Sequence, residues 1–291
     1  MRLRHRPLLL ALALAAAPAL AAAPTASADT SQSSNWAGYA IHHSGVTFKK
    51  VLGTWTQPRV TCTPGDPTYS SAWVGIGGYS ETSNALEQIG TEADCTMAGT
   101  ARSSAWYELV PAPSRTIKLT IDAGDRVRAS VSVLHETVTL TLDDLTRHRS
   151  FSRAVHDSDL DVTSAEWIVE APSVCTSASA QSCQTLPLAD FGSTGFTSAR
   201  ATASTGHAGS IRDRRWDTTK ITLAEGGRRF IGTGGPYGEA SLVTAVPSTL
   251  SAGASAFTVT YQGSTTGVVQ SARRQLSDAQ LVHGHGFSPA S

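Results

Sequence analysis

The sequence predicts an all-β protein, a sandwich of two antiparallel sheets of the concanavalin or jelly-roll kind. Three observations predict this class. Short segments alternate apolar and polar residues, turn residues recur about every eight to twelve positions, and only 16% of the residues are charged. Beyond the N-terminal region no segment combines the apolar spacing of a helix with capping residues.

The first expected strands are runs of strand-forming residues closed by strand breakers. Residues 47–55 mix β-branched and aromatic side chains and end before Pro58. Residues 70–77 are rich in Trp, Val and Ile and lead into a Gly-Gly pair, and residues 101–110 are followed by Pro-Ala-Pro.

The middle of the chain shows the alternation most clearly. Residues 115–121 place Ile, Leu and Ile against Thr, Lys and Thr and stop at Asp-Ala-Gly-Asp. Residues 127–134 carry three valines on one face, and residues 136–142 carry Val and two Leu on one face with threonines on the other. The remaining expected strands are residues 86–92, 165–169, 191–202, 240–246 and 256–261.

The N-terminal region has the pattern of a secretory signal peptide. Three arginines precede an apolar run at residues 8–17, and residues 26–28 form a small-x-small cleavage site. We therefore expect a signal peptide at 1–28, one sandwich domain at 29–262 and a flexible tail at 263–291. The protein is expected to be secreted and extracellular.

The charge balance and the motifs exclude several classes of function. The 23 basic and 23 acidic residues give no excess for nucleic-acid binding, and no later apolar run is long enough to span a membrane after signal cleavage. No His-Glu-x-x-His or Cys-x-x-Cys pattern occurs. We expect no metal, no cofactor and a monomer.

Four cysteines follow the signal peptide, and an even number in a secreted chain predicts two disulfides. Three pairings are possible. Proximity along the chain favours Cys175–Cys183, and therefore Cys62–Cys95.

The candidate catalytic residues are polar side chains inside otherwise apolar strands. They are Gln88, Glu108, Glu166 and Glu170. A carboxylate among Ala, Trp, Ile and Val must face water, a cleft or a partner, because burying it alone is costly. Glu166 and Glu170 share a strand face about 13 Å apart, which is too far for a glycosidase pair.

Eight stretches match, in order, motifs of the glutamic peptidases of the eqolisin family (peptidase family G1, formerly A4), and the chain resembles the bacterial secreted type. They span roughly residues 33–262. The stretches are Ser34-Asn-Trp-Ala-Gly38, Gly53-Thr-Trp-Thr-Gln-Pro58, Ser71-Ala-Trp-Val-Gly-Ile-Gly77, Leu86-Glu-Gln-Ile-Gly90, Ala105-Trp-Tyr-Glu108, Ala165-Glu-Trp-Ile-Val-Glu170, Leu188-Ala-Asp-Phe-Gly192 and Phe257-Thr-Val-Thr-Tyr261.

The resemblance implies two seven-stranded antiparallel sheets and a catalytic dyad of Gln88 and Glu166. It implies that Glu166 is the general base that activates water, and that Gln88 stabilises the tetrahedral intermediate. The substrates would be polypeptides. The residues implied to line the substrate cleft are Trp36, Trp73, Glu92, Trp106 and Glu108.

The expected function is therefore that of an acid endopeptidase. We expect Gln88 and Glu166 on neighbouring strands, and an optimum of about pH 3 to 5 from the unperturbed pKa of Glu. Two alternatives remain open. One is a non-enzymatic carbohydrate-binding sandwich that stacks sugars on its tryptophans, and the other is a glycosidase using Glu108 and Glu166.

Overall fold

Backbone hydrogen bonds join fourteen strands of the described chain into one continuous path that is folded into two layers. The structure is a computed structural model, and it describes residues 28–80, 82–175, 183–224 and 243–263. The expected signal peptide and tail lie outside the described residues, apart from Ala28 and Gly263. No helix is present in the part of the chain that the structure describes, in agreement with the all-β prediction.

One layer, which we call sheet I, contains the strands of the candidate dyad. Its strands lie in the order β16, β2, β11, β4, β5, β6, β7, and all are antiparallel to their neighbours. Their bounds are β16 Asp217–Ala224, β2 Trp36–His42, β11 Ser164–Glu170, β4 Ser71–Gly77, β5 Leu86–Cys95, β6 Ala101–Val110 and β7 Arg115–Ile117.

The second layer, sheet II, continues from the β16–β17 pair, where the path turns back over sheet I. Its strands lie in the order β10, β9, β8, β3, β14, β18, β17. Their bounds are β10 Arg149–His156, β9 Thr137–Asp144, β8 Arg126–Leu134, β3 Phe48–Thr56, β14 Ser193–Ala203, β18 Phe257–Tyr261 and β17 Val243–Pro247. The two seven-stranded sheets match the architecture expected from the sequence.

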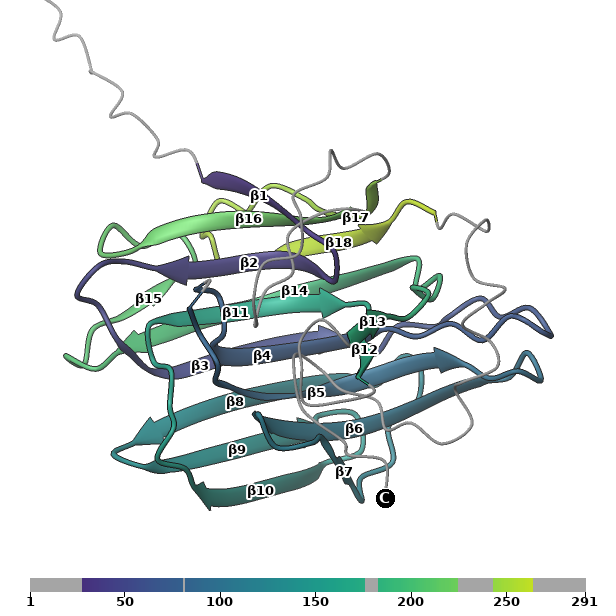
Figure 1. Cartoon of the computed structure of the whole chain (residues 1–291), viewed down its shortest axis with the longest axis horizontal. Coiled ribbons are helices and arrows are strands. Elements are labelled where there is room, and N and C mark those ends of the chain that lie inside the picture. The colour runs from purple at the N-terminus through teal and green to yellow at the C-terminus, as the bar shows by residue number, and fades with distance from the viewer. Residues whose placement is uncertain (1–27, 81, 176–182, 225–242, 264–291) are drawn as a thin grey trace, which may run out of the picture.

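Four short strands lie outside the two seven-stranded orders (Figure 1). The strand β1 (Asp29–Ser33) runs parallel to β16, and β15 (Ala208–Ser210) pairs with β14. The hairpin of β12 (Ser173–Cys175) and β13 (Cys183–Thr185) begins three residues after β11. It therefore follows directly from the strand that carries Glu166.

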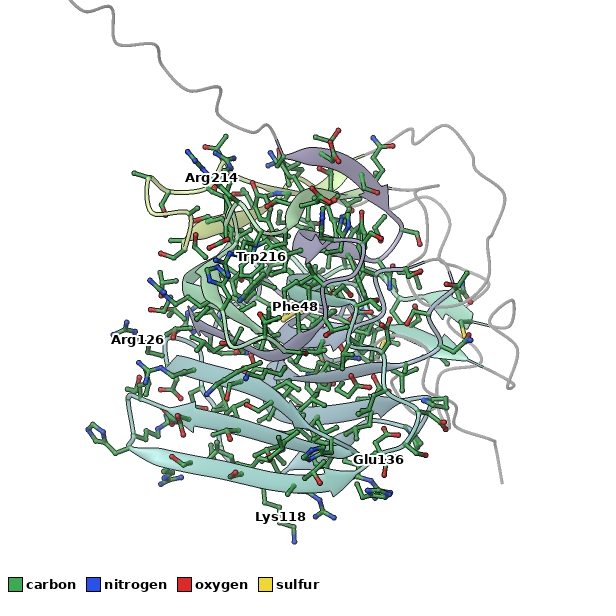
Figure 2. All side chains as sticks on the ribbon, turned by 90° about the vertical axis from the view of Figure 1, so that its left-hand side faces the viewer. Phe48, Lys118, Arg126, Glu136, Arg214 and Trp216 are labelled. Carbon is green, nitrogen blue, oxygen red and sulfur yellow. A yellow bond between two sulfur atoms is a disulfide. The ribbon has the colours of Figure 1, made fainter. Side chains whose placement is uncertain are left out.

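The core lies between the sheets and is made by the inward-facing half of each alternating strand. Two indole groups hydrogen-bond across it: Trp55 donates to the Thr91 hydroxyl at 2.9 Å, and Trp167 donates to the Leu52 carbonyl at 2.8 Å. Phe48 and Trp216, labelled in Figure 2, are buried, and their rings lie 5.5 Å apart. Burial of such large apolar surfaces is the main term that holds the sheets together.

The described cysteines agree with the expected pairing where it can be compared. Cys62 and Cys95 form a disulfide. The backbone register places Cys175 opposite Cys183, and Cys183 is disulfide-bonded. The Cys175 side chain lies outside the described part, so the second pairing stays a prediction.

Replacing both Cys62 and Cys95 by Ala is expected to lower the free energy of unfolding by about 3 kcal/mol, because the disulfide restricts the unfolded chain. The two residues are 33 positions apart, and Cys95 is the last residue of β5. Urea unfolding of the double variant beside the parent protein measures the difference. An unchanged transition midpoint would contradict this account of the bond.

Candidate active site

The two residues of the expected dyad lie on one face of sheet I, separated by a glycine. Glu166 of β11 is directly opposite Gly75 of β4, Gly75 is opposite Gln88 of β5, and Gln88 is opposite Glu108 of β6. Directly opposite residues point to the same side of a sheet. These four positions therefore form a single row across four strands, which we call the dyad row.

The expectation that Gln88 and Glu166 lie on neighbouring strands is wrong, because β4 lies between their strands. Two strand spacings place their backbones about 10 Å apart. Gly75 has no side chain to fill the gap, so the two longer side chains can converge above it. A Cβ at Gly75 would lie 2.9 Å from a Leu86 methyl and 3.0 Å from the Trp73 ring. A side chain at position 75 would therefore displace Leu86 or Trp73 and occupy the space between the two dyad side chains.

The remaining expected site residues lie on the same face, in two further rows. Ile168, Trp73, Gly90 and Trp106 are successive partners across the same four strands. The next row consists of Glu170, Ser71, Glu92 and Ser104, and Trp36 of β2 is opposite Glu170. The period of two along each strand brings these distant stretches of sequence onto one face.

Hydrogen bonds fix the polar side chains of this face. The Gln88 amide nitrogen donates to a Glu108 oxygen at 2.7 Å. Glu170 accepts from the Trp73 indole at 2.8 Å and from the Asn35 amide at 3.2 Å. The Ser104 hydroxyl donates to Glu92. These bonds between strands restrict the rotamers of the carboxylates.

The tryptophans of the face are buried. Trp36, Trp73 and Trp106 are each at most 2% exposed, and Trp36 packs edge-on to Trp73 with ring centroids 5.0 Å apart. They form an apolar cluster with Ile168 and Leu86. Their immediate role is to support the polar rows, and a direct contact with substrate stays a prediction.

Burial dominates the electrostatics of the dyad. Gln88, Glu108 and Glu166 have no exposed surface. Burial raises the pKa of Glu166 well above its ordinary value of 4.5, because a low-dielectric environment disfavours the charged form. The Ser164 hydroxyl lowers this pKa, whereas the negative charges of Asp161 and Glu87 raise it further.

Two of these residues were missed by sequence reasoning. Glu87 lies on the face of β5 opposite to that of Gln88, toward the core, and is fully buried. Burial is the main cause of its raised pKa, and the negative charges of Asp157 and Asp161 raise this pKa further. Strand alternation indicates its orientation once the face of Gln88 is known. Asp161 lies in the β10–β11 connection and carries no local motif. Glu170 was noted in the sequence, but its hydrogen bonds were not foreseen.

No group of three or more His, Cys, Asp or Glu arranged to hold a metal ion occurs within the described residues. Nor does any helix among them have the length and apolar character needed to cross a membrane.

Comparisons with known proteins agree with this fold. Aspergillopepsin-2 of Aspergillus niger is 32% identical over 194 residues, which cover 59% of this chain and 65% of that protein's length. Scytalido-glutamic peptidase, solved with a transition state analog inhibitor, has a TM-score of 0.62 at 25% identity and covers 79% of this chain and 98% of its own.

A second solved structure, aspergilloglutamic peptidase from Aspergillus niger, has a TM-score of 0.50 at 29% identity and covers 67% of this chain and 99% of its own. A family model described as the Peptidase A4 family matches residues 34–227, which include the whole dyad row. The match confirms the family resemblance found in the sequence. The chain belongs to the Peptidase A4 family.

Proposed function

We propose that the chain is a secreted acid endopeptidase that hydrolyses peptide bonds with Glu166 as general base and Gln88 as oxyanion donor. The dyad row is the observation that carries this proposal. It places one carboxyl group and one primary amide on the same face, on either side of Gly75. Such a pair supplies a proton acceptor and a neutral hydrogen-bond donor.

In the proposed reaction a water molecule lies between Glu166 and the scissile carbonyl carbon. Ionised Glu166 takes a proton from the water as the oxygen attacks the carbonyl carbon. The tetrahedral intermediate then collapses as Glu166 returns the proton to the leaving amine. Each cycle consumes one water, and Glu166 ends in its starting state.

Gln88 stabilises the negative charge that develops on the carbonyl oxygen. Its amide nitrogen already donates to Glu108 at 2.7 Å, and this bond orients the amide group. The nitrogen carries two hydrogens, and we assign the second to the oxyanion. A donor held in place before the reaction lowers the barrier, because it need not reorient as charge develops.

Polypeptide substrates and secretion are parts of the same proposal. The related scytalido-glutamic peptidase was solved with a transition state analog inhibitor. Secretion is supported by the Cys62–Cys95 disulfide, because such bonds persist in oxidising compartments. The basic and apolar pattern of the N-terminal region points the same way.

The two alternative functions fit the geometry less well. Glu108 and Glu166 are three strand positions apart in the dyad row, and Gln88 lies between them and donates to Glu108. A glycosidase needs its two carboxyl groups on either side of a sugar, with no amide bound to one of them. Sugar stacking needs free ring faces, whereas Trp36 packs edge-on to Trp73 and the Trp73 indole donates to Glu170.

The pH dependence of peptide cleavage tests this function. We expect kcat/KM for a denatured protein to rise with pH through an apparent pKa above 4.5, because burial raises the pKa of Glu166 and only its ionised form is a base. The optimum should therefore lie above the range of about pH 3 to 5 expected from an unperturbed Glu. Initial rates measured from about pH 2 to 8, with the new termini identified by mass spectrometry, give the profile.

Cleavage should persist in the presence of a chelator. A rate that increases as the pH falls below about 4 would contradict Glu166 as the initial base and indicate that its neutral form is active. The absence of peptide-bond cleavage at every pH tested would overturn the proposed function itself.

A further inference from the structure

The carboxylate of Asp161 is held by donors from three different segments. Its Oδ2 accepts the backbone N–H of Gly78 at 3.1 Å and the hydroxyl of Ser83 at 2.5 Å. Its Oδ1 accepts the backbone N–H of Thr163 at 2.9 Å and the hydroxyl of the same residue at 2.6 Å. Hydrogen bonds to an ionised carboxylate are stronger than those between neutral groups.

These three segments are the ends of the strands that form the dyad row. Gly78 directly follows β4, Ser83 lies three residues before β5, and Thr163 immediately precedes β11. Glu166 lies three residues beyond Thr163, and Gln88 lies five beyond Ser83. A shift of Asp161 would therefore move the ends of the strands that carry Glu166, Gly75 and Gln88.

The backbone around Gly77 is shaped to admit Asp161. Gly77 has a φ of +89°, in the region that favours glycine, and a Cβ at this position would lie 2.4 Å from the backbone oxygen of Asp161. The β10–β11 connection thus packs directly against the last residue of β4. No side chain could be added there without moving that connection.

Asp161 also acts on Glu166 through its charge. After burial, the negative charges that raise the pKa of Glu166 are those of Asp161 and Glu87. The positions beside Glu166 on β2 and β4 are Ala40 and Gly75, which carry no charge. Glu108 on β6 is the other carboxyl group of the dyad row.

We propose that Asp161 is a positioning residue for the dyad: its carboxylate fixes the ends of β4, β5 and β11, the strands that carry Gly75, Gln88 and Glu166. This inference rests on the proposed function, because it assigns a role in the same reaction. Asp161 acts through Glu166 and Gln88.

The test compares two single substitutions that separate charge from attachment. Asp161→Asn removes the charge and weakens the attachment, so the acid limb of kcat/KM should move to lower pH by about half a unit, and kcat should fall about 10-fold. Ser83→Ala removes the hydroxyl that donates to Asp161 and to the Ala85 carbonyl, and it keeps the charge of Asp161. It should lower kcat while the acid limb stays in place.

Asp159→Asn is the matched control. Asp159 lies two residues away, is exposed, and lines the same hollow of about 520 Å³ as Asp161. Asp159 is not among the groups that shift the pKa of Glu166. In Asp159→Asn both kcat and the acid limb of the kcat/KM profile should therefore equal those of the parent protein. Equal shifts in Asp159→Asn and Asp161→Asn would overturn the inference, as would an Asp161→Asn profile identical to that of the parent.

Carbon-13 NMR titration of the Glu166 carboxyl carbon keeps this test independent of catalysis. In Asp161→Asn the pKa of Glu166 should be lower than in the parent protein even if neither cleaves peptides, in which case only the proposed function fails. If the parent is an active peptidase but the titration of Glu166 is the same in both proteins, Asp161 lacks the proposed effect on Glu166. If Asp161→Asn does not fold, Ser83→Ala decides the attachment part, and an unchanged kcat there would overturn it.

Discussion

Glu166→Gln is expected to lower kcat by about 10⁴-fold with little change in KM. Gln has nearly the same shape as Glu but cannot accept a proton from water. Glu166 is fully buried and burial raises its pKa by disfavouring the charged form, so a neutral amide should fit the same space. The loss should therefore come from the chemical step, with the fold preserved.

The measurement is a steady-state comparison of the purified proteins at the pH optimum of the parent, with thermal unfolding recorded for each. Glu136→Gln is a suitable control, because Glu136 is an exposed residue between β8 and β9. It should keep the activity of the parent. If Glu166→Gln retained more than about a tenth of the parent rate, Glu166 could not be the general base.

Gln88→Ala is expected to lower kcat by about 10²- to 10³-fold, the usual loss when one oxyanion donor is removed. The substitution leaves Glu108 without the donor that now lies 2.7 Å away in a buried site, so some loss of stability should accompany it. The kinetic loss should remain at temperatures where the variant is fully folded.

Glu108→Gln separates the two effects in the same assay. A glutamine at position 108 can still accept from the Gln88 amide through its own oxygen. We therefore expect a smaller loss of kcat than in Gln88→Ala. If the two variants lost the same activity, the ionisable carboxyl group of Glu108 would matter as much as the Gln88 amide, which would contradict a separate role of Gln88 as oxyanion donor.

The fold could be predicted from the sequence wherever a strand has one apolar face. Residues 127–134 and 136–142 became β8 and β9 with small changes of their ends. The strand expected at 115–121 is shorter, because β7 ends at Ile117 and the Leu119 N–H turns back to the Ile117 carbonyl. Apolar and polar residues continue to alternate after Ile117, although the backbone no longer pairs with β6 there.

Strands without that pattern were missed. β10 is an edge strand whose side chains are mostly exposed on both faces, so its sequence shows no apolar alternation. β16 lies between β2 and β17, but its first residues are polar, so the sequence pattern did not indicate a strand there. Position within a sheet, which depends on distant segments, decides these elements.

The site was predictable in its residues and less so in its arrangement. Strand alternation and family motifs selected Gln88 and Glu166, but no local pattern indicates that β4 pairs between their strands. Asp161 contacts Ser83 and Gly78, which precede it in the sequence by 78 and 83 positions, and also Thr163, two positions after it. The strand order and the long-range contacts follow from how the whole chain folds.

The buried carboxyl groups have a consequence for the conditions in which the protein stays folded. Glu166, Glu87 and Asp94 all have a pKa raised, chiefly by burial, above the ordinary values of 4.5 for Glu and 3.8 for Asp. The native state therefore binds more protons than the unfolded chain as the pH rises above those values. This contribution to stability is complete in acid and is lost as the pH rises through the raised native values. Neutralising the medium would thus weaken the fold as well as change the ionisation of Glu166.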